Sequence, residues 1–448
     1  GSYLAWFLVC LVVCVVVVLR TRSHERITVT ADFKKFQRGF LLVYLIMMAS
    51  DWMQGPYVVA LYQHYGFSLG DIGHLFIVGF GSSMVFGTFV GGLADRFGRR
   101  ANCIAFGVLY AVSCLTKHVN NYNVLMVGRL LGGIATSILY SAFETWMVHE
   151  HTSNGFPEDW LSNTFSVMTF GNGAVAIVAG LVASVAADLG GPVMPFDISF
   201  VLLVLGTLIV AKRWPENYGE SSGSTGMGLE NFRQAWSVVT SNERVLLLGI
   251  IQSCFEAAMY IFVFMWTPAM KAYDADIPHG IIFASFMVCL MIGSNLFRGL
   301  QGDATIESFL RFVFLIAGVC LAVPVIIPGA RTNLIAFCAF EAACGIYFPG
   351  MGTLRGKYVP EEVRATVMNI FRIGLNLIVV LVLSNIDRMT TESIFSLCSF
   401  LLLLAWAAQH RLFALTNTNA SAAERSAAGL EEGEEVDELL STKQDVAA

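Results

Sequence analysis

Six ionisable side chains lie inside apolar runs of membrane-spanning length, where they could bind a charged solute or carry a proton. They are Asp51, Arg129, Glu144, Glu256, Glu341 and Arg372. A charge at the centre of a transmembrane helix costs about 2.5–3.5 kcal/mol on insertion scales, so such groups are usually functional. At about 1.5 Å per residue, four of them lie near the middle of the bilayer, namely Asp51, Glu256, Glu341 and Arg372. Charges at the same depth on different helices predict a binding site between those helices.

Arg372 is the predicted anion-binding residue. Its guanidinium group is always charged, and its planar fork of donors suits tetrahedral oxyanions. Asn369 and Asn376, at positions i−3 and i+4, share its helical face and could donate further hydrogen bonds. The alternative is an interhelical clamp in which Arg372 pairs with Glu256 or Glu341.

Polar residues also follow the helical faces of two of the acids. Gln252 and Tyr260 lie at i−4 and i+4 from Glu256, and Gln54 lies at i+3 from Asp51. Both stripes predict cavity walls, with Gln54, Gln252 and Tyr260 as substrate-binding residues. The alternative is a hydrogen-bonded polar clamp between helices.

The balance of charges constrains the solute. Near mid-membrane the carboxyl groups outnumber the arginines, even when Arg129 is counted. An anion would be repelled if all acids were ionised, but burial and like charges both favour the neutral carboxyl group. We therefore expect Asp51, Glu256 and Glu341 to carry protons, although the small residues around Glu341 also suit tight packing. The rival solute is an organic cation exchanged for protons, which Arg372 would repel.

The composition of the chain indicates a polytopic membrane protein. Hydrophobic residues make up 56% of its 448 residues and charged residues 13%, with a mean hydropathy of +0.66, whereas a soluble domain carries roughly 25% charged residues. A span needs about 20 apolar residues. Such runs occur at residues 36–62, 69–93, 101–118, 122–149, 162–187 and 194–211, and again at 244–270, 279–298, 308–328, 332–354, 362–385 and 391–413. A further run at 3–19 precedes them, and the basic residues after it favour a retained helix over a signal peptide.

Basic residues indicate the orientation of these spans. If residues 91–100, G-G-L-A-D-R-F-G-R-R, form a cytoplasmic loop, most Lys and Arg residues fall on that side, as the positive-inside rule requires. The expected domains are an extra N-terminal transmembrane helix with a basic loop (1–35), a six-helix bundle (36–212), a cytoplasmic linker (213–243), a second six-helix bundle (244–415) and a disordered acidic tail (416–448).

Other functions lack their motifs in this sequence. No basic patch interleaved with aromatic residues suggests nucleic acid, and no H-E-x-x-H, G-x-S-x-G or P-loop motif suggests an enzyme. The ten cysteines form no C-x-x-C pair and lie mostly in apolar runs, so neither a zinc site nor disulfides are predicted. We therefore expect no cofactor and no metal.

Three motifs resemble those of the major facilitator superfamily of secondary transporters. They are residues 91–100, G-R-L-L-G-G at 128–133 and P-E-E-V-R-A at 360–365. The resemblance implies an all-α polytopic membrane protein with two six-helix bundles, plus the extra N-terminal helix. It also implies a gating or coupling role for Arg129, whose alternative is a helix-packing ion pair. The expected cytoplasmic gate consists of Gly91, Asp95, Arg96, Gly98, Arg99 and Glu144.

Longer stretches are similar to the molybdate-anion transporter family. They include D-W-M-Q-G-P-Y (51–57), S-A-F-E-T-W-M-V-H-E-H (141–151), F-V-F-M-W-T-P (262–268) and N-I-F-R (369–372). The resemblance implies secondary active import of molybdate, a tetrahedral dianion, by alternating access around a midplane site. The alternatives are a proton-coupled transporter of another small solute, either an organic cation or another anion, and a non-transporting receptor or scaffold on the same fold.

The expected partners are molybdate, protons and the lipid bilayer, with the chain acting as a monomer and no nucleic acid involved. We expect a multi-pass protein of the plasma membrane. The alternative is an endosomal or vacuolar membrane, because E-V-D-E-L-L at 435–440 fits an acidic dileucine sorting pattern.

Overall fold

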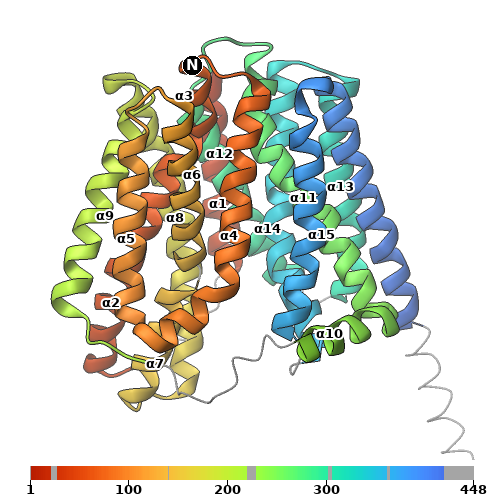
Figure 1. Ribbon diagram of the computed structural model, residues 1–448. Coiled ribbons are helices and arrows are strands. Elements are labelled where there is room, and N and C mark those ends of the chain that lie inside the picture. The colour runs from red at the N-terminus through yellow and green to blue at the C-terminus, as the bar shows by residue number, and fades with distance from the viewer. Residues whose placement is uncertain are drawn as a thin grey trace, which may run out of the picture.

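A computed structural model describes residues 2–21, 28–139, 141–218, 229–300, 305–360 and 364–417 of the chain. Within these ranges the regular secondary structure is helical, and eleven helices are long and apolar enough to cross a membrane. Most of the helices run up and down beside one another (Figure 1). The predicted all-α polytopic membrane protein is therefore confirmed.

The N-terminal bundle follows the predicted spans. Its elements are α2 (Ala31–Gln54), η1 (Gly55–Tyr57), α3 (Val58–His64), α4 (Leu69–Phe97), α5 (Arg99–Thr116), α6 (Tyr122–Leu139), α7 (Ala142–Ser153), α8 (Glu158–Gly190) and α9 (Met194–Arg213). Pro56 lies where α2 gives way to η1, because proline cannot continue the hydrogen-bonding pattern of an α-helix. Thr30 and Ser68 begin α2 and α4 by accepting hydrogen bonds from the backbone N–H groups of Phe33 and Asp71.

The C-terminal bundle consists of α11 (Glu243–Lys271), α12 (His279–Leu300), α13 (Ile306–Ile326), α14 (Ala330–Tyr358), α15 (Arg364–Ser384), η3 (Ile386–Arg388) and a last helix, Thr391–Asn417. Asn242 caps α11 by accepting from the backbone N–H groups of Arg244 and Val245. A helix in the region expected to be a linker, α10 (Leu229–Ser241), runs across the ends of α11 and α15 (Figure 1). The two bundles stand side by side, which is the predicted major facilitator architecture.

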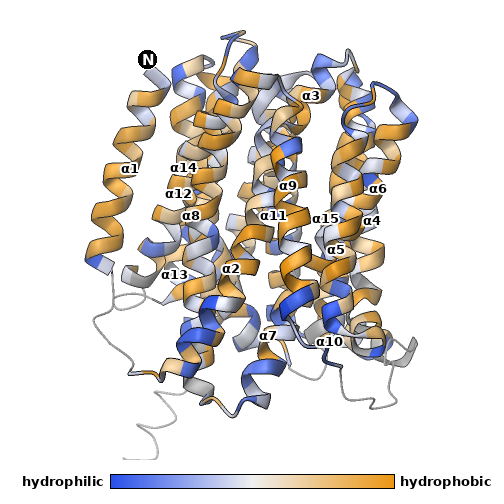
Figure 2. Ribbon diagram, turned by 90° about the vertical axis from the view of Figure 1, so that its left-hand side faces the viewer, coloured by the Kyte–Doolittle hydropathy of each residue, from blue (hydrophilic) through white to orange (hydrophobic). Residues whose placement is uncertain are grey.

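The extra helix α1 (Ser2–Thr21) packs on the C-terminal bundle, although the N-terminal bundle follows it in sequence (Figure 2). Tyr3 donates to Asp274 in the α11–α12 loop (2.9 Å), and Trp6 Nε1 donates to Cys338 Sγ on α14 (3.3 Å). On the other face of α1, Val12 and Leu19 are 63% exposed, as suits contact with lipid. Hydropathy predicts this helix but carries no information about which bundle it joins.

Contacts between the two bundles extend from the end where α4 begins towards the middle of the helices. The Gly70 N–H donates to Asp387 Oδ1 (2.8 Å). A methyl group on Gly280 of α12 would lie 2.2 Å from the Gly180 carbonyl oxygen of α8, so glycine permits this close crossing. Further in, aromatic rings of α4 and α11 pack edge to face. The bundles are therefore joined at the end where α4 begins.

The expectation of a loop at residues 91–100 is wrong. Helix α4 continues to Phe97 and α5 begins at Arg99, so only Gly98 separates them. Gly98 has φ +107°, a backbone conformation that residues with a side chain rarely adopt. A methyl group there would also lie 2.4 Å from the carboxyl carbon of Glu216. One glycine makes the whole turn because it permits both the positive φ and the close approach.

Candidate functional site

Arg372 lies on α15, between the two bundles. Its guanidinium group approaches α4, where a methyl group on Gly87 would lie 3.9 Å from Arg372 Nη1. Helix α15 is held against α11 by Ser253 Oγ, which donates to the Phe371 carbonyl oxygen (3.3 Å). Arg372 is exposed, and its guanidinium group makes no hydrogen bond or ion pair with the described residues. Its charged fork of donors is therefore available to a ligand.

Glu256 on α11 lies among the polar residues near Arg372. Tyr347 of α14 donates to Glu256 Oε1 (3.0 Å). One helical turn away, Gln252 Oε1 accepts from Arg355 Nη1 of α14 (3.0 Å). Both Arg355 and Arg372 interact electrostatically with the Glu256 carboxyl group. We call the set formed by α11, α14 and α15 the central polar site: Gln252, Glu256, Tyr260, Tyr347, Arg355 and Arg372.

Tyr260 forms the outer side of the central polar site. It lies one turn beyond Glu256 on α11, and its ring centre is 5.0 Å from that of Phe80 on α4. One further turn out, the rings of Phe264 and Phe76 meet edge to face at 5.2 Å. Because these aromatic pairs bridge the two bundles, they cover the site from the outside.

The two asparagines predicted beside Arg372 have different surroundings. Asn376 Nδ2 donates to the Arg372 carbonyl oxygen (2.7 Å), so this amide group serves its own helix. Asn369 is half-buried, and its side chain makes no hydrogen bond to the part of the chain that the structure describes. Both stay predictions as anion ligands, and Asn369 has the freer amide group.

Asp51 and Gln54 make their hydrogen bonds inside the N-terminal bundle. Tyr110 of α5 donates to Asp51 Oδ1 (2.6 Å). Gln54 Nε2 donates to Ser199 Oγ of α9 (3.0 Å), and the side chain of Gln54 is buried. The structure therefore places both residues in contacts between neighbouring helices, which is the polar-clamp alternative, and their roles in binding and proton transfer stay predictions.

Glu341 is buried at a tight helix crossing. It lies on α14 and is 6% exposed. A methyl group on Gly293 of α12 would lie 1.9 Å from the carbonyl oxygen of Ala342, so the two backbones nearly touch there. Close packing thus accounts for the small residues around Glu341, and its proton-carrying role stays a prediction.

Arg129 on α6 packs against α4. Its Nε donates to the Leu75 carbonyl oxygen (3.3 Å), and its guanidinium carbon lies 4.7 Å from the ring centre of Phe76. Gly79 leaves room for it, since a methyl group there would lie 2.4 Å from Arg129 Nη2. These contacts hold α6 against α4. They differ from the ion pair that the packing alternative predicts, because the partners of Arg129 are a carbonyl group and an aromatic ring.

The expected gate region binds the segment that follows α9. Glu216 accepts hydrogen bonds from the first backbone N–H groups of α5, beginning with Arg100 (2.8 Å), and so caps this helix. The Arg99 N–H donates to the Asn217 carbonyl oxygen (2.9 Å), and Asn217 Nδ2 donates to Glu150 Oε1 (3.0 Å). All of these contacts stay within the N-terminal bundle. Sequence reasoning missed Glu216, because no motif marks it and only its position beside α5 gives it a role.

The other predicted gate residues lie on α4 and α7. Gly91 and Asp95 belong to α4, but their surroundings fall outside the described side chains. The guanidinium carbon of Arg96 lies 5.3 Å from the ring centre of Phe97, and Glu144 is exposed on α7. A gating role for these residues stays a prediction.

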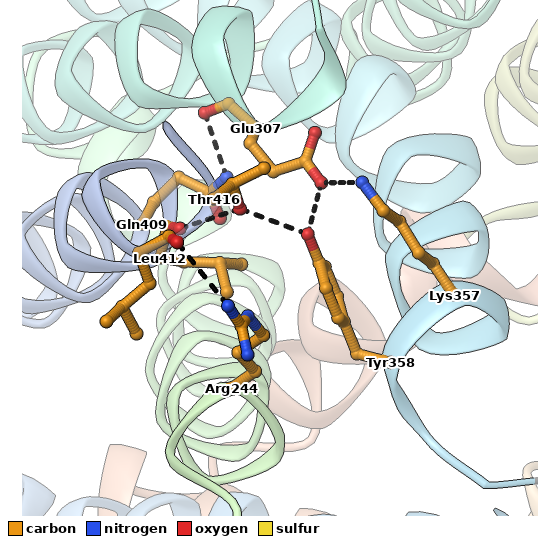
Figure 3. Close-up of polar contacts among 8 residues, drawn as sticks. Arg244, Glu307, Lys357, Tyr358, Gln409, Leu412 and Thr416 are labelled. Atoms are coloured by element: carbon orange, nitrogen blue, oxygen red, sulfur yellow. Dashed lines mark hydrogen bonds and ion pairs between the residues drawn. The ribbon is translucent and has the colours of Figure 1, made fainter. Parts of the chain in front are cut away.

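A second polar network ties together the ends of α13, α14 and the last helix of the C-terminal bundle (Figure 3). Buried Glu307 of α13 accepts from Lys357 Nζ (2.5 Å) and from the Tyr358 hydroxyl group (2.6 Å), both on α14. The Glu307 carbonyl oxygen accepts from Gln409 Nε2 of the last helix (3.1 Å). Because Glu307 already has a cationic partner, we interpret this network as a structural clamp.

The central polar site combines hydrogen-bond donors with one acidic group. It contains two guanidinium groups and two tyrosine hydroxyl groups, which can donate hydrogen bonds to an oxyanion, and one carboxyl group, which can take up a proton. Within the described ranges, no group of three His, Cys, Asp or Glu side chains is placed to hold a metal ion. The site is therefore suited to recognition of a small charged solute.

Sequence reasoning missed two members of the central polar site, Tyr347 and Arg355. Arg355 lies in the last turn of α14, where a basic residue at a cytoplasmic helix end needs no further explanation. Only the crossing of α11 and α14 reveals that its side chain reaches Gln252. No spacing along a single helix could have identified either residue.

Comparisons with known proteins identify the family. Residues 2–342 match a family profile described as sugar transporters with 12 transmembrane segments. The chain is 39% identical over 409 residues to the molybdate-anion transporter of Xenopus laevis, which covers 86% of this chain and 88% of that protein. It is 35% identical over 422 residues to the molybdate-anion transporter of Danio rerio, covering 84% and 85% of the two chains.

Solved transporter structures share the fold. The nucleoside transporter NupG superimposes with a TM-score of 0.67 at 13% identity, covering 84% of this chain and 99% of NupG. A peptide transporter, POT, does so with a TM-score of 0.69 at 13% identity, covering 86% and 94%. At such identities the likeness concerns the fold alone. From the profile and the relatives it follows that this chain belongs to the molybdate-anion transporter family and is a multi-pass membrane transporter, not an enzyme.

Proposed function

We propose that this protein imports molybdate by alternating access, with Arg372 as the residue that binds the anion. The observation that carries the proposal is the guanidinium group of Arg372, which lies between the bundles, exposed and without a hydrogen bond or salt bridge to the described residues. An unpaired charge in a transmembrane helix is costly, so a bound oxyanion would supply the missing partner. The name carried by the relatives supports molybdate as the cargo.

The contacts of the two bundles support alternating access. On the outer side, Gly70 and Asp387 form a hydrogen bond between bundles, and α8 crosses α12 at Gly180 and Gly280. On the cytoplasmic side, the residues around Arg99 bind the segment after α9 in their own bundle. Outer contacts between bundles combined with inner contacts within one bundle are expected of an inward-facing transporter, in which the bundles rock about the central polar site.

We further propose that Glu256 carries a proton during the cycle. An ionised Glu256 would repel a dianion bound to Arg372, whereas a neutral carboxyl group could donate a hydrogen bond to it. Tyr347 donates a hydrogen bond to Glu256 Oε1, which holds the carboxyl group in place within the central polar site. Asp51 and Glu341 are further candidates for proton transfer. The transport reaction would then be symport of an anion and protons.

Uptake of labelled molybdate into cells tests the proposal. Arg372→Lys should reduce uptake about tenfold or more, because an ammonium group lacks the planar fork of a guanidinium group. Arg331→Lys changes an exposed arginine at the outer end of α14 and is the matched control, which should transport normally. Equal uptake by the Arg372→Lys variant and the wild type would contradict the role of Arg372. No uptake by correctly localised wild-type protein would contradict the cargo.

Competition separates molybdate from other solutes. Tungstate has the same charge and shape as molybdate, so an excess of tungstate should inhibit uptake. The degree of inhibition by sulfate then measures the selectivity of the site. Inhibition by lipophilic amines in place of tungstate would favour an organic cation as the cargo. A complete lack of substrate-dependent flux or thermal shift would favour a receptor or scaffold.

We place the transporter in the plasma membrane, with an endosomal or vacuolar membrane as the alternative. The acidic dileucine pattern that motivates the alternative lies outside the described residues. Imaging of a tagged protein with and without Leu439→Ala and Leu440→Ala distinguishes the two, because loss of a working sorting signal would move the protein to the cell surface.

A further inference from the structure

We propose that Arg355 is a second anion-binding residue of the central polar site, and that the two arginines together make the site selective for dianions. This inference rests on the proposed function, since it concerns the anion that Arg372 binds. It adds to the binding site a residue that the sequence places only among the cytoplasmic basic residues. It also specifies the charge of the substrate.

Arg355 reaches the central polar site from the cytoplasmic side. It lies in the last turn of α14, and its Nη1 donates to Oε1 of the buried Gln252 on α11 (3.0 Å). Gln252 is one helical turn from Glu256 and on the same face. The Glu256 carboxyl group interacts electrostatically with both Arg355 and Arg372. Two guanidinium groups, from α14 and from α15, therefore act electrostatically on one carboxyl group.

Arg355 retains most of its hydrogen-bond donors. A guanidinium group has five N–H donors, and the bond to Gln252 engages one nitrogen of Arg355 with a neutral amide. Arg355 forms no ion pair with the described residues, whereas Lys357 in the same turn pairs with Glu307 (2.5 Å). Lys357, which has a structural role at this end of α14, thus has an acidic partner, whereas Arg355 has none among the described residues.

The charge balance of the site determines which anions fit. Arg355 and Arg372 supply two positive charges, which a dianion balances when Glu256 holds a proton. A monoanion would leave one positive charge uncompensated inside the membrane, and an uncompensated buried charge is costly. Tetrahedral dianions such as molybdate, tungstate and sulfate therefore match the site better than tetrahedral monoanions such as perrhenate.

A purely structural role for Arg355 is the competing explanation. Arg355 would then only hold α14 against α11 through Gln252, and removal of either partner would have the same effect. The anion-binding role predicts a difference between the two variants, because Gln252→Ala removes the amide group but leaves the charge of Arg355 in the site.

Equilibrium binding to the purified full-length protein in lipid nanodiscs tests the inference. Titration calorimetry would compare sodium molybdate with sodium perrhenate, which has a similar shape and one charge fewer. Arg355→Gln should weaken molybdate binding by about tenfold to a hundredfold and perrhenate binding much less, so that the preference for the dianion is lost. Arg355→Lys should retain part of this preference, and Gln252→Ala and the control Arg331→Gln should retain most of it.

Three results would overturn the inference. The first is molybdate binding by Arg355→Gln that equals wild-type binding, and the second is an equal loss for both anions. The third is a loss of the preference for the dianion in Gln252→Ala as large as that in Arg355→Gln, which would assign Arg355 to helix packing. Failure of the wild type to bind molybdate would be a different outcome, since it would contradict the proposed function itself.

Discussion

Arg129 and Arg372 are both arginines in transmembrane helices, but their surroundings differ. Arg129 stacks on Phe76 at 4.7 Å and donates to the Leu75 carbonyl oxygen, all within one bundle. Arg372 faces the other bundle, exposed and without a hydrogen bond or ion pair among the described residues. Fixed partners suit a charge that stays in place throughout the transport cycle. A charge without such partners is typical of a group that takes up and releases an anion.

The comparison shows how to separate structural from functional charges in a membrane protein. An ionisable residue in a transmembrane helix is a functional hypothesis by default, but its partners decide whether the hypothesis survives. Asp51, bonded to Tyr110, resembles Arg129 in this respect. Glu256 belongs with Arg372, because its carboxyl group interacts electrostatically with Arg372 and with Arg355 from two other helices.

Arg372→Gln should produce the largest effect, and the effect should be on transport. We expect uptake of molybdate by reconstituted protein to fall about a hundredfold, because the anion loses a charged bidentate partner. The melting temperature should stay within about 2 °C of the wild type, since no described residue loses a bond. A large drop in melting temperature, measured on the same preparation, would show that Arg372 holds helices together instead.

Arg129→Gln should act on stability more than on transport. The variant loses the cation–π contact with Phe76 and the charge-assisted hydrogen bond to α4, so we expect the free energy of unfolding to fall by about 2 kcal/mol. Denaturant unfolding in detergent micelles would measure this, with Arg331→Gln as the exposed control. Normal stability with abolished uptake would reverse the comparison and favour the gating role that the family resemblance implies.

Glu256→Gln should flatten the dependence of uptake on external pH. If a neutral Glu256 accompanies anion entry, wild-type uptake should rise as external pH falls, whereas glutamine mimics the neutral form at every pH. Asp276→Asn is the matched control, because it changes an exposed acid in the loop between α11 and α12 and should leave the pH profile in place. Wild-type uptake that does not change with external pH would contradict proton coupling.

Alanine substitutions at two glycines of α4 should have the smallest effects on stability, and these effects should have opposite signs. Alanine at Gly79 would place a methyl group 2.4 Å from Arg129 Nη2, so we expect Gly79→Ala to lower the free energy of unfolding by about 1 kcal/mol. Alanine at Gly87 would lie 3.9 Å from Arg372 Nη1, an ordinary contact, so the higher helix propensity of alanine should leave stability equal or slightly raised. Thermal unfolding of the Gly79→Ala and Gly87→Ala variants measures both effects. Equal losses of stability would mean that Arg372 is packed as closely as Arg129.

The sequence by itself determined the architecture and the depth of each charge. Apolar runs of spanning length predicted the helices, and the distribution of Lys and Arg predicted their orientation. Helical spacing placed Gln252, Glu256 and Tyr260 on one face of α11, where the structure has them as well. These are local properties, because each depends on residues a few positions apart in a single helix.

Only the tertiary structure decided which residues meet. Asp51 and Glu256 are both acids at a similar depth, but the first accepts a hydrogen bond from Tyr110 of its own bundle and the second accepts one from Tyr347 of α14. Arg355 is a helix-end residue in the sequence, but in the fold its side chain reaches Gln252 of α11, and α1 joins the C-terminal bundle. Hydropathy and helix periodicity determine how deep a side chain lies and on which face. The rotation and crossing of each helix depend on how all its side chains pack against its neighbours at once.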